Sequence, residues 1–162
     1  MVMTKFIFMG LCGLLYVLGL LFGWNYQETS VYVCIYLWPI LCILSTLPII
    51  YYNIKKIVVK GKGYIALLFS FLYNYSYIIV FTCVLQHYSL IETPIGKNSI
   101  NIVFNQCYQD LIQIASTCNT TYEIVNLVIY VLLFLIIMFV NTLIPLKLKK
   151  SINKYARKKL HL

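Results

Sequence analysis

Apolar residues are concentrated in four long runs that are separated by more polar segments along the 162 residues. The runs are continuous and do not alternate between apolar and polar positions, so each predicts a helix rather than a barrel strand. A helix needs about 20 residues to cross a bilayer. The pattern therefore predicts an all-α, polytopic membrane protein, a single membrane domain over residues 1–162. Its predicted spans are residues 6–24, 31–52, 64–85 and 124–146.

The longest polar segment, residues 86–123, contains a shorter pattern of its own. Apolar residues recur there every three or four positions, at Ile100, Val103, Phe104, Cys107, Leu111 and Ala115. This spacing predicts the apolar face of an amphipathic helix that lies along the membrane or caps the bundle. Because no other sizeable element is expected on that side, Val103, Phe104 and Leu111 are candidate sensing residues.

Composition supports the membrane class. The chain is 62% hydrophobic and 10% charged, whereas a soluble domain is about one quarter charged. The net charge of +9 would fit a nucleic-acid partner only if the bases formed one folded face. They instead flank the apolar runs, so we expect a lipid bilayer as the surroundings and no direct contact with nucleic acid.

The bases also predict an orientation. Only Lys97 of the 13 bases lies on the side of the long loop, together with all four acids. By the positive-inside rule, both termini and the loop between the second and third spans face the cytoplasm. We therefore expect a multi-pass protein of the bacterial inner membrane.

A basic tail, residues 147–162, follows the fourth span. Its lysines and arginine alternate with apolar residues at helical spacing, which predicts a short amphipathic helix. Such a helix contacts anionic lipids or docks an acidic cytoplasmic partner. The docking residues are Lys147, Lys149, Lys150, Lys154, Arg157, Lys158 and Lys159.

Two cysteines, Cys107 and Cys118, lie in the outer loop, where an oxidising compartment favours a disulfide. On one continuous helix they would be roughly 16 Å apart, but a disulfide tolerates at most about 7 Å between Cα atoms. A disulfide therefore requires the helix to end near Ile114. Pairing with Cys34 or Cys83 is the alternative.

Several residues inside the spans are suited to helix packing. Gly19 and Gly23 form a GxxxG pair that allows close approach of helices. Asn74 and Asn141 are amides in apolar surroundings, and each needs a polar partner. That partner is a neighbouring helix, or the amides line an oligomeric pore. Prolines at 39, 48 and 145 are expected to kink or end helices.

Catalytic chemistry has no support in the sequence. The chain has two histidines, no acid within a span, no phosphate-binding glycine loop, no metal-ligand spacing and no CxxC pair. His87 fits an interfacial residue better than a metal ligand. We therefore predict a protein that is not an enzyme and has no cofactor.

The four spans, cytoplasmic termini and lysine-rich end resemble KwaA, the membrane subunit of bacterial Kiwa antiphage systems. That resemblance implies a homotetrameric sensor of infection at the envelope, with a cytoplasmic DNA-binding partner, KwaB, that blocks phage replication.

A second resemblance involves the stretch Tyr77–Gly96, YIIVFTCVLQHYSLIETPIG, and the fourth span that ends at Ile144-Pro145 before lysines. These are similar to the immunity proteins against pore-forming colicins of the A and B type. That family implies a monomer that blocks a toxin's helical hairpin in the bilayer. Its first outer loop is long, whereas the corresponding segment here, Asn25–Ser30, is short. A third reading is an accessory subunit of a larger membrane complex. We favour the non-enzymatic defence sensor.

Overall fold

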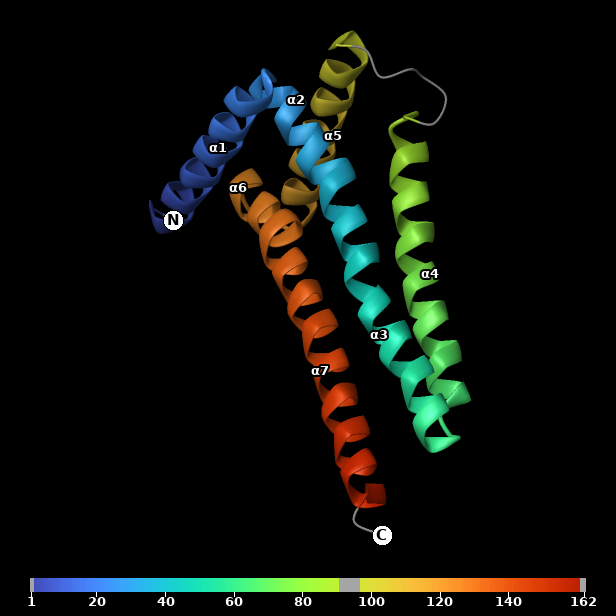
Figure 1. The fold of residues 1–162 in the computed structure, drawn as a ribbon. Helices are drawn as coiled ribbons and strands as arrows, with labels where there is room; N and C mark the ends of the chain where they lie inside the picture. Colours follow the sequence, from blue (N-terminus) through green and yellow to red (C-terminus); the bar gives the residue numbers. More distant parts are fainter. Residues whose placement is uncertain (1, 91–96, 161–162) are drawn as a thin grey trace. The chain divides into compact units, whose positions relative to one another are not determined.

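The computed structural model describes residues 2–90 and 97–160, and every regular element within them is helical (Figure 1). Separate helices are α1 (Val2–Phe22), α4 (Tyr64–His87) and α5 (Lys97–Thr117). Two longer helical stretches consist of α2 (Tyr26–Val31), η1 (Tyr32–Leu37) and α3 (Trp38–Lys60), and of α6 (Tyr122–Asn126), η2 (Leu127–Leu132) and α7 (Leu133–Leu160). Within the described residues, four helices are long and apolar enough to cross a membrane. The all-α class and the presence of four helices long and apolar enough to span a membrane are therefore confirmed for the described residues.

Two helices continue well past the predicted ends of their spans. The second span was expected to end at Tyr52, but α3 continues to Lys60 and stops only before Gly61, whose φ is +65°. The fourth was expected to end at Leu146, but α7 continues to Leu160 through Pro145. The apolar pattern marks where each apolar run ends, whereas lysine and asparagine can continue a helix beyond that point.

The prolines inside these helices do not terminate them. Pro48 lies within α3 and Pro145 within α7. Each proline lacks the N–H that would bond the carbonyl four residues earlier, which here belongs to Leu44 and Asn141 respectively. Of the two expectations, a kink or a helix end, the helix end is wrong at Pro48 and Pro145, because helices in apolar surroundings tolerate proline where neighbouring groups can compensate.

The junction between α1 and α2 is a tight turn. Gly23 has a φ of +69°, and the N–H of Trp24 donates to the Gly19 carbonyl over 2.8 Å, which is the Schellman pattern of a helix end. Helix α2 then begins with a capping box, in which the side chains of Asn25 and Glu28 each accept the other's backbone N–H over 2.8 Å. The segment expected to be the first outer loop is therefore mostly helical.

Wide π-helical turns interrupt the two longer stretches. In η1 the N–H of Trp38 donates to the Val33 carbonyl, and in η2 the N–H of Leu133 donates to the Val128 carbonyl, each five residues back. Pro39 lies two positions after the last residue of η1, and its nitrogen cannot donate an ordinary helical bond to the Ile35 carbonyl. No proline accompanies η2. Single π turns inside helices are frequent at functional sites.

The chain divides into two compact units, and the first covers the described residues of Met1–Pro39 and Thr82–Phe134. In this unit α5 packs on α2 and α6. The face of α5 predicted from spacing is the buried one: Val103 is 3% exposed and Leu111 is 5% exposed, while Phe104 and Cys107 are partly buried. Two apolar clusters, centred on Val31 and on Leu111, hold α5 in place.

The second unit covers the described residues of Ile40–Phe81 and Leu135–Leu162, from α3, α4 and α7. Its interior is unusually polar, because Thr46, Asn53, Ser70 and Asn141 are 5% exposed or less. Its exterior carries many large apolar side chains, such as Leu72, Val80 and Phe139, each more than half exposed. This arrangement suits lipid surroundings, where apolar surface need not be buried and polar side chains join the helices.

Candidate functional site

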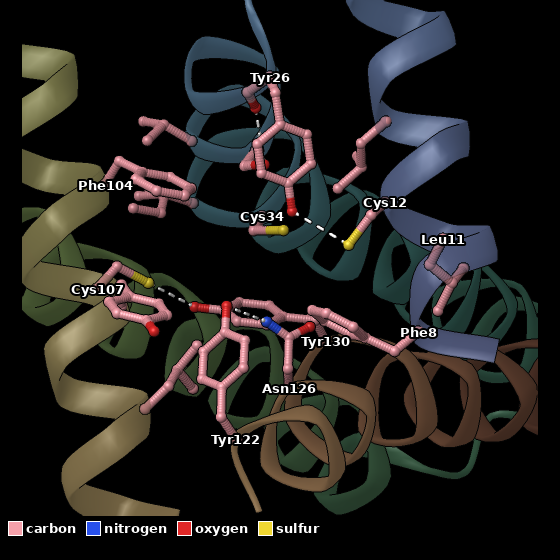
Figure 2. Close-up of a pocket in the computed structure, with 16 residues that line it drawn as sticks. Phe8, Leu11, Cys12, Tyr26, Cys34, Phe104, Cys107, Tyr122, Asn126 and Tyr130 are labelled. Atoms are coloured by element: carbon pink, nitrogen blue, oxygen red, sulfur yellow. Dashed lines mark hydrogen bonds between the residues drawn. The ribbon is translucent and has the colours of Figure 1, made fainter. Parts of the chain in front are cut away.

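A cavity of about 60 Å³ lies in the first unit, where α1, α2, η1, α5, α6 and η2 converge (Figure 2). Both π-helical turns contribute to it, η1 through Cys34 and Ile35 and η2 through Tyr130. Its wall also contains Phe8, Leu11, Cys12 and Leu15 of α1, Tyr26, Ser30 and Val31 of α2, Phe104, Cys107, Tyr108 and Leu111 of α5, and Tyr122 and Asn126 of α6. The predicted face of α5 therefore forms one wall of this cavity.

Thiol and phenol groups are paired around the cavity, as Figure 2 shows. The Cys12 sulfur lies 3.3 Å from the Tyr26 hydroxyl, and the Cys107 sulfur lies 3.0 Å from the Tyr130 hydroxyl. The Asn126 amide donates to the Tyr122 hydroxyl over 3.2 Å. These bonds connect α1 to α2 and α5 to η2. The cavity wall is therefore neutral, hydrogen-bonded and large enough for a few water molecules.

These groups do not form a metal centre. Three cysteines, Cys12, Cys34 and Cys107, line the cavity. Even so, no group of three or more His, Cys, Asp or Glu side chains could hold a metal ion within residues 2–90 and 97–160. What the arrangement offers is a packing gap under α5 and two wide helical turns beside it.

The predicted disulfide between Cys107 and Cys118 is absent from the structure. All six cysteines are free. Helix α5 does not end near Ile114 but runs to Thr117, and the Cys118 N–H still donates to the Ile114 carbonyl over 2.9 Å. The chain turns only at Asn119, whose φ is +50°. Cys107 and Cys118 thus stay on one continuous helical course, which excludes the Cys107–Cys118 disulfide.

The two glycines have different roles. A methyl group on Gly19 would lie 2.5 Å from the Thr29 hydroxyl oxygen and 2.7 Å from the Trp24 carbonyl oxygen. Gly19 therefore allows a close approach, but to α2 of the same chain. Gly23 has open space around it and ends α1 through its positive φ. Together they form a helix end rather than one continuous packing face.

Both span amides have partners inside the second unit. Asn74 on α4 donates to the Ile43 carbonyl over 3.2 Å and to the Thr46 hydroxyl, both on α3. Asn141 on α7 is 1% exposed; it donates to the Ser45 hydroxyl over 2.7 Å and accepts from the Tyr73 hydroxyl over 2.9 Å. Asn141 thus joins all three helices of the unit.

The basic residues of the tail continue α7. Among those with described side chains, Lys147, Lys149, Lys150, Lys154 and Arg157 are all exposed. The side chains of Lys158 and Lys159 lie outside the described part. The end of α3 contacts this segment, since the Lys60 ammonium donates to the Ser151 hydroxyl over 3.0 Å and lies 5.3 Å from the centre of the Tyr155 ring.

A second cluster lies in the first unit at the end of α4. His87 Nε2 lies 3.1 Å from Asp110 Oδ2, and the Tyr88 hydroxyl donates to the same oxygen over 3.1 Å. Sequence reasoning assigned no role to Asp110 and missed the cavity-lining tyrosines. The partners of Asp110 are 22 or more positions away in the chain, so no local spacing could reveal them. By contrast, the capping box of Asn25 and Glu28 follows a local sequence pattern, an N-cap residue with glutamate three positions later, and the sequence alone could have predicted it.

Comparisons with protein-family models, with curated proteins and with solved structures found no match to this chain.

Proposed function

We propose that this chain is a non-enzymatic sensor subunit of a bacterial antiphage defence complex in the inner membrane. It would detect an event at the outer face of the envelope and relay it to a cytoplasmic effector. The observation that supports this proposal most is the seating of α5 over a cavity that two π-helical turns border.

The cavity and the π turns together suit a sensor. A gap beneath α5 leaves contacts unmade, so displacing α5 costs less than displacing a fully packed helix. A π turn holds one extra residue per turn and is a site where helical register can shift. Because η1 is continuous with α3 and η2 with α7, a shift at either turn would move a helix that extends toward the basic residues.

The charge distribution supports the direction of the relay. The second unit contains no acidic residue, while its helix ends carry the lysines of α3 and α7. The positive-inside rule favours a cytoplasmic location for this end and for both termini. The outer side would then carry α5 and all four acidic residues.

The basic end of α7 suits a protein partner better than a lipid surface. From Lys147 to Arg157 the helix extends roughly 15 Å, whereas the headgroup layer is about 5–8 Å thick on each side. The contacts of Lys60 with Ser151 and Tyr155 hold α7 beside α3, so α7 is not free to lie flat on the membrane. Lys154 and Arg157 would stand beyond the headgroups, available to an acidic effector.

The proposal is tested in cells that carry the native locus of this gene. Replacing Lys147, Lys149, Lys150, Lys154 and Arg157 by glutamine should abolish phage protection and co-purification of the effector, while membrane abundance stays unchanged. Lys5→Gln is the control with a base outside this cluster. If no phage in a broad panel plates less efficiently on cells with the intact locus, the defence role is refuted.

The alternative is an immunity protein against a pore-forming bacteriocin, and one observation favours it. Asn74 and Asn141 find their partners within the chain, so neither requires a symmetry mate, and a monomer satisfies both. The mass of the purified protein in detergent separates the two proposals. A homo-oligomer, expected to be a tetramer, supports the sensor; a monomer that protects cells against a toxin encoded beside the gene supports immunity.

A further inference from the structure

We propose that the groove between the end of α4 and the C-terminal half of α5 binds an organic cation, a ligand with a guanidinium or ammonium group. This inference rests on the proposed function, because it assigns the chemical class of the signal that α5 would receive. All the residues that line the groove belong to the first unit.

The groove has the size and lining of a ligand site. Its volume is about 490 Å³, within the range of about 300–1,000 Å³ typical of small-molecule sites. Most of its wall is apolar surface, and a few polar groups are set into it, as is typical of small-molecule sites. The lining residues include His87, Tyr88, Asp110, Gln113 and Thr117, with Ile114 as the aliphatic member.

Asp110 supplies the negative charge, and its neighbours hold it in position. Its Oδ2 atom contacts both His87 Nε2 and the Tyr88 hydroxyl at 3.1 Å. Burial, with the nearby Cys107 thiol and the Asp110 carboxylate, raises the pKa of Tyr88 above its ordinary value. The two contacts orient the Asp110 carboxylate before a ligand arrives.

The lining selects a cation over an anion or a metal ion. No lysine or arginine is among the groove residues, so an anion would meet a carboxylate without a fixed counter-charge. A metal ion would need more ligands than the carboxylate and imidazole, and the described residues contain no such group. A guanidinium or ammonium group needs only the carboxylate, and the Tyr88 ring offers an additional cation–π surface.

The test uses the full chain in nanodiscs of zwitterionic lipid, titrated with N-acetyl-arginine amide and followed by tryptophan fluorescence and by calorimetry. The neutral isostere N-acetyl-citrulline amide is the matched probe. We expect the arginine compound to bind about tenfold more tightly than the citrulline compound, because only the former makes a charge-assisted bond. Equal binding of the two probes, or no binding of either, would overturn the proposal.

Variants locate the site. Asp110→Asn keeps the shape and the hydrogen-bonding oxygen but removes the charge, so it should reduce arginine-amide affinity about tenfold to the level of the citrulline probe. Glu123→Gln removes a carboxylate that lies outside the groove and should leave affinity unchanged. Loss of binding in Glu123→Gln with retention in Asp110→Asn would refute the groove. The phage and pull-down assays do not depend on this result, so failure of the ligand proposal is distinguishable from failure of the sensor role.

Discussion

Gly19 is the residue where a single methyl group should matter most. In Gly19→Ala the new methyl would collide with the Thr29 hydroxyl, which is 1% exposed, and with the rigid Trp24 carbonyl. We expect a loss of about 1–3 kcal/mol in the free energy of unfolding, as for other overpacked sites, measured by thermal denaturation in detergent. Gly13→Ala is the matched control, because nothing lies within 4 Å of its new methyl. Equal stability of the two variants would show that α1 does not pack on α2 in this way.

Asn141 is the residue that joins the helices of the second unit. Asn141→Leu should remove one hydrogen bond from each of the Ser45 and Tyr73 hydroxyls, which keep their bonds to the Cys42 carbonyl and the Tyr77 hydroxyl, and should lower the free energy of unfolding by about 1–2 kcal/mol. Thr142→Val is the neighbouring control, since Thr142 is exposed and its hydroxyl bonds only the Met138 carbonyl of its own helix. Steric trapping in bicelles measures the free energy of unfolding of both variants. A destabilisation in Thr142→Val as large as that in Asn141→Leu would contradict the assigned role.

At the scale of elements, α5 offers adjacent residues with opposite environments. Val103 is 3% exposed and Ile102 is 66% exposed. Val103→Asn places an amide in the apolar cluster around Val31 and removes about 1.5–3 kcal/mol of apolar burial. Ile102→Asn changes only exposed surface. We expect faster hydrogen exchange across α5 in Val103→Asn and unchanged exchange in Ile102→Asn. Similar exchange in both variants would mean that α5 is not held by this face.

The same helix shows what the sequence could predict. The spacing of Val103, Phe104 and Leu111 revealed the buried face of α5, because burial on one side of a helix leaves a local periodic trace. A helix after Leu146 was also predicted, from apolar residues at helical spacing among the lysines, but its unbroken continuation of α7 through Pro145 was not, because proline ordinarily ends or kinks a helix. The π turns of η1 and η2 were also missed. A π turn forms when a backbone N–H donates to the carbonyl five residues back instead of four. Tertiary packing, rather than the neighbouring residues, determines which of the two bonds forms.

At the scale of the whole molecule, the proposed orientation in the membrane rests on the distribution of charge and is directly testable. A variant that keeps Cys118 and has its other five cysteines replaced by serine presents one exposed thiol just after α5. A second variant, in which all six native cysteines are replaced by serine and Asn153→Cys is added, presents one thiol at an exposed position beside the basic residues of α7. From the positive-inside rule we expect these two thiols on opposite sides of the membrane.

Labelling with a membrane-impermeant maleimide reads out the two sides. In intact spheroplasts the Cys118 thiol should react and the thiol introduced by Asn153→Cys should not, whereas after permeabilisation both should react. Both positions are exposed, so a difference in intact spheroplasts reports the side of the membrane rather than burial. If only the α7 thiol reacted in intact spheroplasts, the orientation would be the opposite of the one proposed. It would also place the basic residues outside, where a cytoplasmic effector could not reach them, and the relay from α5 to such an effector would fail with it.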